Sequence, residues 1–333
     1  MVTMAVALAC ATAGTGTVLR IWKVDVGGRW NVLSDLYASL DPVAFTIGPL
    51  QVRWYGLAYL AAFVIAALIV WRVARRWRLG LVADDLFTFV IAVAFGVIIG
   101  GRLGYVLFYG NGYYLQHPLE IVMLSEGGMS FHGGLLGAMV GGAVAARILG
   151  IPFLTLADLA SIATPVGLLF GRIANFINGE LWGKPTDLPW GVVFANTGGG
   201  PLPRHPSQLY EALLEGAVLL VVMLVLAHAY PPRPRGTFLG VFCVLYACFR
   251  CAIEFVRVPD AQLGYLYGGF LTMGMVLCIP LLVCGIILLW YARARRLPQM
   301  GRPSVSREHD GEPESPSSSQ DEGGGAGGGR GDV

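Results

Sequence analysis

The stretch "GGFLTMGMVLCIPLLVCGIILLWY", Gly268 to Tyr291, contains no charged residue and is followed by Arg293, Arg295 and Arg296. An α-helix rises 1.5 Å per residue, so about 20 apolar residues cross a hydrocarbon core roughly 30 Å thick. The stretch therefore predicts a transmembrane helix that ends beside basic residues on one face of a membrane.

The rest of the chain has the same character. Its 333 residues are 55% hydrophobic and only 13% charged, with a mean hydropathy of +0.64, far more apolar than a soluble core requires. We predict an all-α polytopic membrane protein with seven transmembrane helices and a small loop region outside the membrane. The predicted spans are approximately Trp54–Trp71, Leu86–Tyr109, Gly133–Leu149, Leu156–Ile173, Tyr210–Ala229, Gly236–Val256 and Gly268–Tyr291.

These spans divide the chain into parts. Residues 41–297 form the seven-span domain, in which residues 184–205 form an outer loop or cap. Residues 1–40 are predicted to be a poorly structured extension. The tail from 298 to 333 is rich in Ser, Pro, Glu and Gly and is predicted to be disordered in the cytoplasm.

Basic residues set the predicted orientation, because cytoplasmic loops carry an excess of Arg and Lys. They follow spans one, three, five and seven: Arg72, Arg75, Arg76, Arg78, Arg147, Arg233, Arg235, Arg293, Arg295 and Arg296. All of these loops lie on one side of the membrane. The N-terminus is therefore predicted outside the cell and the C-terminus in the cytoplasm.

Several chemical classes are disfavoured. A net charge of +2 without a basic stripe argues against nucleic acid. Cys248 and Cys251 form a CxxC pair, but no matching His or Cys cluster accompanies it, as a zinc site would require. The sequence shows no glycine-rich phosphate loop, no carboxylate cluster suited to Mg²⁺ and no GxSxG segment. We expect neither metal nor cofactor.

Ionisable residues gather at the outer ends of the predicted spans. An ionisable group at bilayer depth costs at least a few kcal/mol, so such a group at one level on six helices is a functional-site hypothesis. For any single member, the alternative is a side chain that snorkels to the headgroup region. The residues are Arg53, Arg102, His132, Arg172, Glu211, Glu215, Arg250, Glu254 and Arg257.

The end of span six places its polar residues on one helical face. Tyr246, Arg250, Glu254 and Arg257 follow a spacing of i, i+4, i+8 and i+11, so Arg250 and Glu254 are expected to pair. Such a pair orients a guanidinium and leaves it donors for an anion.

Span four ends in the polar segment "GRIANFINGELWG", Gly171 to Gly183. Gly171 is expected to allow close helix approach, and Gly179 and Gly183 to end the helix. Asn175 and Asn178 are suited to satisfying backbone groups freed by the break. His132, at the start of span three in "SFHGG", has a structural and a catalytic interpretation of equal standing. An arginine-rich pocket at the outer leaflet suggests an anionic phospholipid headgroup as ligand.

Six segments together resemble bacterial prolipoprotein diacylglyceryl transferases. They are "DPVAFTIGPLQVRWYGLAYL" (41–60), "GGRLGYVLFY" (100–109), "GGMSFHGG" (127–134), "GRIANFINGELWG" (171–183), "PRHPSQLYEALLEG" (203–216) and "FRCAIEFVRVPDAQLG" (249–264). The resemblance runs in order from about Asp41 to Arg296 and leaves out both termini.

The resemblance implies a reaction. The diacylglyceryl group of phosphatidylglycerol passes to the thiol of the lipobox cysteine in a preprolipoprotein signal peptide, and glycerol phosphate is released. It also implies a bacterial plasma (inner) membrane protein with its active site towards the outer leaflet. By resemblance, His132, Arg250 and Tyr55 are catalytic. The residues implied to bind phosphatidylglycerol are Arg172, Asn175, Asn178, Glu180, Gly183, Tyr246 and Glu254.

Two alternatives stay open on the residues alone. A lipid or anion transporter would also gather arginines in a membrane, but it predicts charges spread over the membrane depth and inverted repeats. A different phosphatidylglycerol-consuming transferase would need the same pocket, and only the resemblance separates it.

Overall fold

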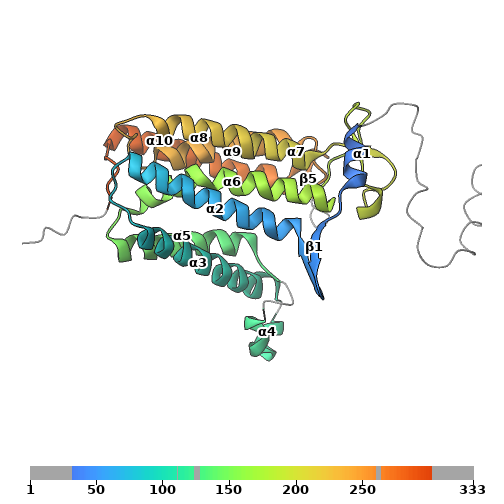
Figure 1. Ribbon diagram of the computed structural model, residues 1–333, viewed down its shortest axis with the longest axis horizontal. Coiled ribbons are helices and arrows are strands. Elements are labelled where there is room, and N and C mark those ends of the chain that lie inside the picture. Colours follow the sequence, from blue (N-terminus) through green and yellow to red (C-terminus); the bar gives the residue numbers. More distant parts are fainter. Residues whose placement is uncertain (1–31, 111, 124–127, 260–263, 302–333) are drawn as a thin grey trace, which may run out of the picture.

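The computed structural model of the chain describes residues 32–110, 112–123, 128–259 and 264–301, apart from a few side chains, that of His132 among them. Every predicted span is largely helical (Figure 1). The spans are α2 (Trp54–Arg76), α3 (Ala83–Tyr109), α5 (Phe131–Leu149), α6 (Phe153–Asn178), the consecutive α7 (Ser207–Glu211), π-helix η4 (Ala212–Val218) and α8 (Leu219–His228), α9 (Thr237–Glu254) and α10 (Met273–Arg295).

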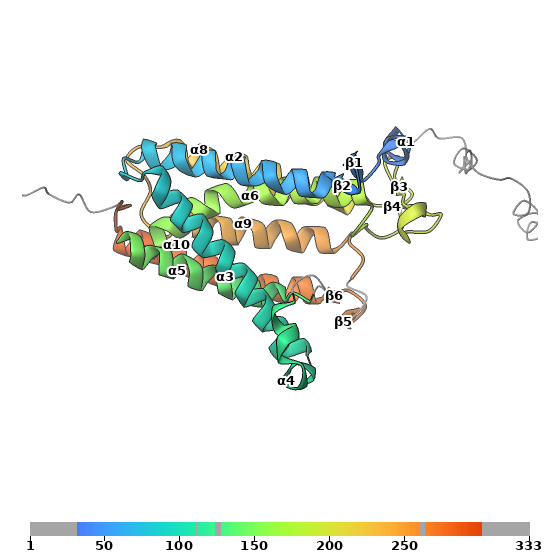
Figure 2. The same cartoon turned by 60° about the horizontal axis from the view of Figure 1, so that its bottom comes forward.

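Six of these helical segments are long and apolar enough to cross a membrane, and α5 is a shorter apolar helix. The chain is therefore a polytopic membrane protein. Helices α2, α6, α8, α9 and α10 run side by side, as the two views agree (Figures 1 and 2). The core that α2, α6, α8 and α9 share includes the buried residues Ile162, Leu219, Met223 and Phe238.

The short helix α5 packs along α3 through glycines. A Cβ added to Gly137 would lie 1.9 Å from the Gly96 carbonyl oxygen, and one added to Gly133 would lie 2.2 Å from that of Gly100. The two backbones are therefore in direct contact, which only glycine allows at these positions.

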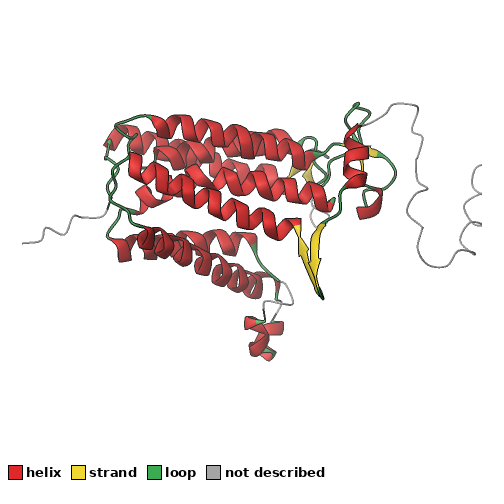
Figure 3. Cartoon of the chain, in the orientation of Figure 1, coloured by secondary structure: helices red, strands yellow, loops and turns green. Residues whose placement is uncertain are grey.

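Three small antiparallel sheets join the helices, so the all-α prediction is wrong in this detail (yellow in Figure 3). Residues 268–272, predicted as the start of span seven, belong to the third sheet and its turn. Connecting backbone must find hydrogen-bond partners outside the helices, and strands this short show no sequence period. The pairs are β1 (Val43–Ile47) with β2 (Leu50–Arg53), β3 (Val192–Val193) with β4 (Pro203–Arg204), and β5 (Tyr265–Tyr267) with β6 (Leu271–Thr272).

Four short helical elements complete the described chain: α1 (Val32–Ser39), α4 (Tyr113–Gln116), η1 (Pro118–Val122) and η3 (Ala195–Thr197). Residues 32–39 of the segment predicted to be poorly structured form the helix α1. Tyr37 of α1 is buried, with its ring centroid 4.7 Å from that of Phe194 in the 184–205 loop. Residues 1–31 lie outside the described residues.

The first residues of the predicted disordered tail are also held in place. The side-chain amide of Gln299 donates to Asp158 Oδ2 at 2.7 Å, and the amide of Met300 donates to Thr155 Oγ1 at 3.5 Å. Residues 302–333 lie outside the described residues.

One end of the bundle, on the left in Figure 1, holds the loops that carry the predicted cytoplasmic arginines. There Arg76 Nε donates a hydrogen bond of 2.6 Å to the His228 carbonyl oxygen. The backbone amide of Arg235 donates one of 2.9 Å to the Leu297 carbonyl oxygen. The first bond joins the ends of α2 and α8, and the second joins the segment before α9 to the segment after α10. The C-terminus of α6 and the helix α7 lie at the opposite end of the bundle, and they carry Arg172 and Glu211.

Candidate functional site

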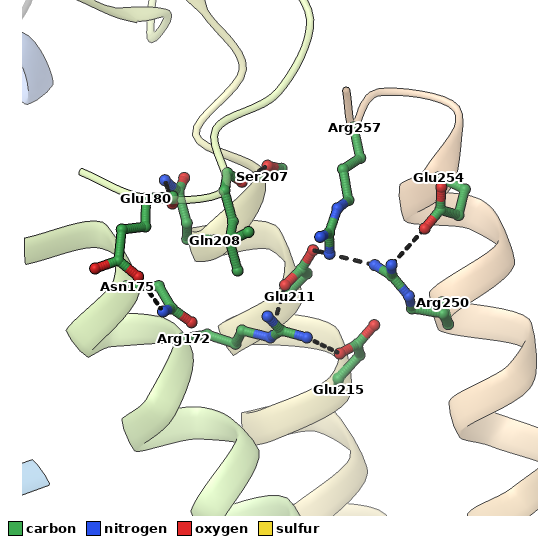
Figure 4. Close-up of polar contacts among 11 residues, drawn as sticks. Arg172, Asn175, Glu180, Ser207, Gln208, Glu211, Glu215, Arg250, Glu254 and Arg257 are labelled. Atoms are coloured by element: carbon green, nitrogen blue, oxygen red, sulfur yellow. Dashed lines mark hydrogen bonds and ion pairs between the residues drawn. The ribbon is translucent and has the colours of Figure 1, made fainter. Parts of the chain in front are cut away.

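Glu211, fully buried at the end of α7, holds three arginines (Figure 4). Its Oε2 lies 2.6 Å from Arg172 Nε of α6. Its Oε1 accepts hydrogen bonds of 3.2 Å from Nη1 of Arg250 in α9 and from Nη1 of Arg257, just beyond α9. One carboxylate therefore links two other helices and the segment that follows α9.

The expected pair of Arg250 and Glu254 is confirmed, with Nη2 of the arginine against Oε1 of the glutamate. Glu254 is buried and also accepts a hydrogen bond of 2.8 Å from Thr272 Oγ1. Arg250 thus lies between Glu254 and Glu211, and its guanidinium is oriented from two sides.

The close packing of α6 on the π-helix η4 brings Arg172 to Glu211. A Cβ on Gly216 would lie 2.7 Å from the Leu169 Cα, whereas one on Gly171 would make only an ordinary 3.7 Å contact with Tyr59 Oη. Gly216, and not Gly171, therefore makes the close approach. π-helical turns are rare and frequently mark functional sites.

The C-terminus of α6 and the segment after it form a turn held by side-chain hydrogen bonds, which we call the tied turn. Gly179 ends the helix with φ 68°, as predicted. The side-chain amides of Asn175 and Asn178 donate to the two carboxylate oxygens of Glu180 at 3.4 and 3.1 Å, and not to freed backbone groups as predicted. The Glu180 carbonyl in turn accepts from the side chain of Gln208 in α7.

Gly183 has a different role from the predicted one. It lies in extended backbone, where its amide donates to the His205 carbonyl at 2.9 Å and its neighbour across the bridge is Arg257. A Cβ there would lie 2.6 Å from the Val256 carbonyl oxygen. The prediction of Gly183 as a helix ender is therefore wrong, because the residue instead lets two loop segments pass in close contact.

His205 belongs to the loop beside Gly183, outside the helices. Burial lowers the pKa of its imidazole, and the positive charge of Lys184 lowers this pKa further. A neutral ring is thereby favoured at pH 7, with Nδ1 lying 3.3 Å from the hydroxyl of Tyr210.

Two tyrosines that were predicted as site residues, Tyr55 and Tyr246, lie beside the cluster. The hydroxyl of Tyr55 in α2 is 3.2 Å from that of Tyr59, and it interacts electrostatically with Glu180 and Arg172. Tyr246 stacks on Phe242, with ring centroids 5.7 Å apart, one helical turn before Arg250.

Two other outer charges lie elsewhere. Arg102 is buried, and its guanidinium donates to the carbonyls of Glu120, Ile121, Met123 and Gly128, which holds that segment against α3. Arg53 is exposed at the end of β2. The prediction that all outer charges form one pocket is wrong for both. His132 is the second residue of α5, and its side chain lies outside what the structure describes.

The cluster is suited to binding an anion. The glutamates are buried, whereas the side chains of Arg172 and Arg250 remain 18% and 15% exposed. Each guanidinium has five N–H donors, more than its described carboxylate contacts use. Within the described residues, no three His, Cys, Asp or Glu side chains are grouped as a metal ion would require.

The sequence analysis included Glu211, Glu215 and Arg257 among the outer charges of the functional-site hypothesis but gave them no catalytic or lipid-binding role. Glu211 is the residue that matters most, because it organises the arginines. The sequence does contain an indication of this role: Glu211 and Glu215, four residues apart, interrupt an otherwise apolar span and share one helical face.

Comparison with known proteins decides the family. Residues 42–291 match the family model described as prolipoprotein diacylglyceryl transferase. The chain belongs to the prolipoprotein diacylglyceryl transferase family. Similar proteins, each named phosphatidylglycerol–prolipoprotein diacylglyceryl transferase, come from several bacteria. The one from Nitratidesulfovibrio vulgaris (strain DP4) is 51% identical over 261 residues, 76% of this chain and 95% of its own length.

Two further members of the family agree. The one from Methylococcus capsulatus is 50% identical over 266 residues, which cover 78% of this chain and 98% of the relative. The one from Nitrobacter hamburgensis is 46% identical over 289 residues, which cover 82% and 97%. The matched region contains every residue of the arginine–glutamate cluster.

Proposed function

We propose that the reaction of this family takes place at the cluster of Arg172, Arg250 and Arg257 around Glu211. The chain is a transferase that moves the diacylglyceryl group of phosphatidylglycerol to a prolipoprotein. The observation that carries the location is the single buried carboxylate that orients three guanidiniums at one end of a membrane-spanning bundle.

The phosphodiester of phosphatidylglycerol binds to Arg172 and Arg250. Both guanidiniums are partly exposed, and both are fixed by carboxylates before the lipid arrives. Preorganised donors of this kind stabilise charge that develops during a reaction without a cost of reorganisation at that moment. The tied turn of Asn175, Asn178 and Glu180 forms one wall beside Arg172.

The acceptor is the thiol of the lipobox cysteine, of which only a few per cent is thiolate at neutral pH. His132 removes the thiol proton, and the positive field of the arginines favours the thiolate. The sulfur then forms a bond to glyceryl C3, and the bond between C3 and the phosphate oxygen breaks. The electron pair stays on that oxygen, beside Arg172 and Arg250, and glycerol phosphate leaves.

The remaining residues support this geometry. Glu254 and Tyr246 set the position of Arg250 on α9, and Tyr55 lies across from Arg172 on α2. Gly183 keeps the outer loop close to Arg257. None of these steps needs a metal or a cofactor.

The enzyme spans the bacterial plasma (inner) membrane seven times, with the shorter α5 as span three, the N-terminus outside and the C-terminus in the cytoplasm. The gathering of basic loops at the end opposite the cluster supports this orientation, because cytoplasmic loops carry excess arginine. The site then lies towards the outer leaflet, where phosphatidylglycerol and exported signal peptides are both within reach.

Purified protein incubated with phosphatidylglycerol and a lipobox peptide tests the function. Mass spectrometry should show the mass gain of one diacylglyceryl group on the cysteine, together with free glycerol phosphate. A peptide with serine in place of the cysteine should gain nothing. Lipid movement without a peptide mass gain would instead identify a transporter and overturn the proposal.

A further inference from the structure

Glu215 is a buried carboxylate in the π-helix η4 that the proposed reaction does not use. Its side chain has no exposed surface, and neither carboxylate oxygen accepts a hydrogen bond from the described residues. The cation that forms an ion pair with it is Arg172, whose Nη2 lies 3.9 Å from Oε2 (Figure 4).

The other two glutamates of the cluster are held much more firmly as anions. Glu211 has three guanidinium nitrogens within 3.2 Å, and Glu254 has the Arg250 guanidinium and a hydroxyl. Burying a carboxylate without such partners costs several kcal/mol, and a group in that position tends to take up a proton instead. Glu215 is therefore the carboxylate of the cluster that is most readily neutralised.

In the described part of the chain, the thiol of Cys278 acts on Glu215 from α10, and the further groups that act on it lie in or beside the cluster. Arg172 faces it from α6, Glu211 precedes it by one turn, and Tyr246, Arg250 and Arg257 act on it from α9 and the segment after α9. The three arginines balance the three glutamates, Glu211, Glu215 and Glu254. A bound phosphodiester adds one negative charge to this balanced set.

We propose that Glu215 takes up a proton when the phosphodiester of an anionic phospholipid binds beside Arg172. The neutral carboxyl then no longer competes with the phosphate for the Arg172 guanidinium, and the charge of the buried cluster stays balanced. Glu215 is a positioning residue that acts through Arg172. This inference rests on the proposed headgroup site.

Calorimetry on the purified full-length chain in detergent tests the inference. A short-chain phosphatidylglycerol is titrated at pH 8 in Tris and in HEPES, whose ionisation enthalpies differ, so the difference in measured heat counts the protons exchanged. We expect about one proton taken up per bound lipid. Glu215→Gln should bind at least as tightly with no proton uptake. Asp187→Asn, at an exposed carboxylate of the outer loop, should behave like the wild type.

A second measurement needs no variant. If one proton is taken up, the dissociation constant of the wild type should rise up to tenfold per pH unit above pH 8, because the phosphodiester itself does not titrate there. Binding without proton exchange and without this pH dependence would overturn the inference, as would unchanged proton uptake in Glu215→Gln. Phosphatidylglycerol binding that is unaffected by Arg172→Gln would instead overturn the proposed site.

Discussion

At the scale of single residues, the site is organised by Glu211. A carboxyl group with no exposed surface stays ionised inside a membrane protein only when it is paired, and Glu211 is paired three times. Its two hydrogen-bonded partners lie 39 and 46 residues away in the chain. The arginines therefore depend on Glu211 for their mutual positions as much as on their own helices.

We predict that Glu211→Gln lowers the stability of the folded protein by about 3 kcal/mol or more, because it leaves one buried and two mostly buried guanidiniums short of their shared counter-charge. Thermal unfolding in detergent should show a clear fall in the melting temperature, with loss of transfer. Asp187→Asn serves as the exposed control. A Glu211→Gln protein as stable and active as the wild type would show that Glu211 is dispensable.

The second prediction at the scale of residues concerns His132, the proposed general base. Replacing a general base typically costs 100-fold or more in rate, so His132→Gln should lower transfer at pH 7 by about that factor. Raising the pH to 9 supplies thiolate directly and should recover about tenfold or more of the loss. A rate that does not recover with pH assigns His132 to positioning and removes it as the sole activator of the thiol.

Individual polar residues were predictable where the apolar background made them conspicuous. The Arg250–Glu254 pair followed from helical spacing alone, because both partners lie on one helix. The links from Glu211 to Arg172, Arg250 and Arg257 did not, because contacts between helices depend on how the helices pack. For the same reason Arg102 was assigned to the pocket, although it binds backbone carbonyls.

At the scale of elements, the position of η4 against α6 determines whether Arg172 reaches its partners. Gly216 lies against the Leu169 backbone, so Gly216→Ala should force the two helices apart and cost about 1–3 kcal/mol. We expect a lower melting temperature and weaker transfer, measured on the purified protein.

Gly167→Ala in α6 is the matched control, since an added Cβ there meets nothing within 4 Å. It should be neutral or slightly stabilising, because alanine favours a helix interior by about 1 kcal/mol over glycine. Equal effects of the two substitutions would mean that the close approach at Gly216 is unimportant.

Helix positions were predictable from apolar runs, but helix ends were not. Span one was predicted to stop at Trp71, yet α2 continues to Arg76, because long basic side chains can reach water while the backbone stays helical. The start of α10 was placed too early, since the turn after β5 and the strand β6 were taken as part of the membrane-spanning run. Composition alone does not distinguish an apolar hairpin from the first turn of a helix.

At the scale of the whole molecule, the two ends of the bundle are fixed in different ways. Opposite the site, the fully buried Asp158 of α6 accepts hydrogen bonds of 2.8 Å from the amides of Gly236 and Leu239 at the start of α9, and one of 2.7 Å from Gln299. One carboxylate thus caps α9 and holds the chain beyond α10.

Asp158→Ala should therefore destabilise the fold by about 1–3 kcal/mol, because it leaves buried donors without an acceptor. Gln299→Ala removes the bond to Asp158 and an exposed one of 3.2 Å to the Arg233 carbonyl, and it should cost about 1 kcal/mol, because Asp158 keeps its two amide donors. Thermal unfolding of the two variants should show this order. A Gln299→Ala protein less stable than Asp158→Ala would contradict the view that Asp158 is the anchoring group.

The central claim is that the guanidiniums of the cluster bind the phosphate of phosphatidylglycerol and stabilise its departure. Its most direct test is the rate of diacylglyceryl transfer to a lipobox peptide by membrane-inserted Arg250→Ala, compared with the wild type and with the exposed Arg53→Ala. We predict at least a 100-fold loss for Arg250→Ala, the typical effect of removing one such donor, and near wild-type transfer for Arg53→Ala. Full transfer by folded Arg250→Ala would contradict the claim.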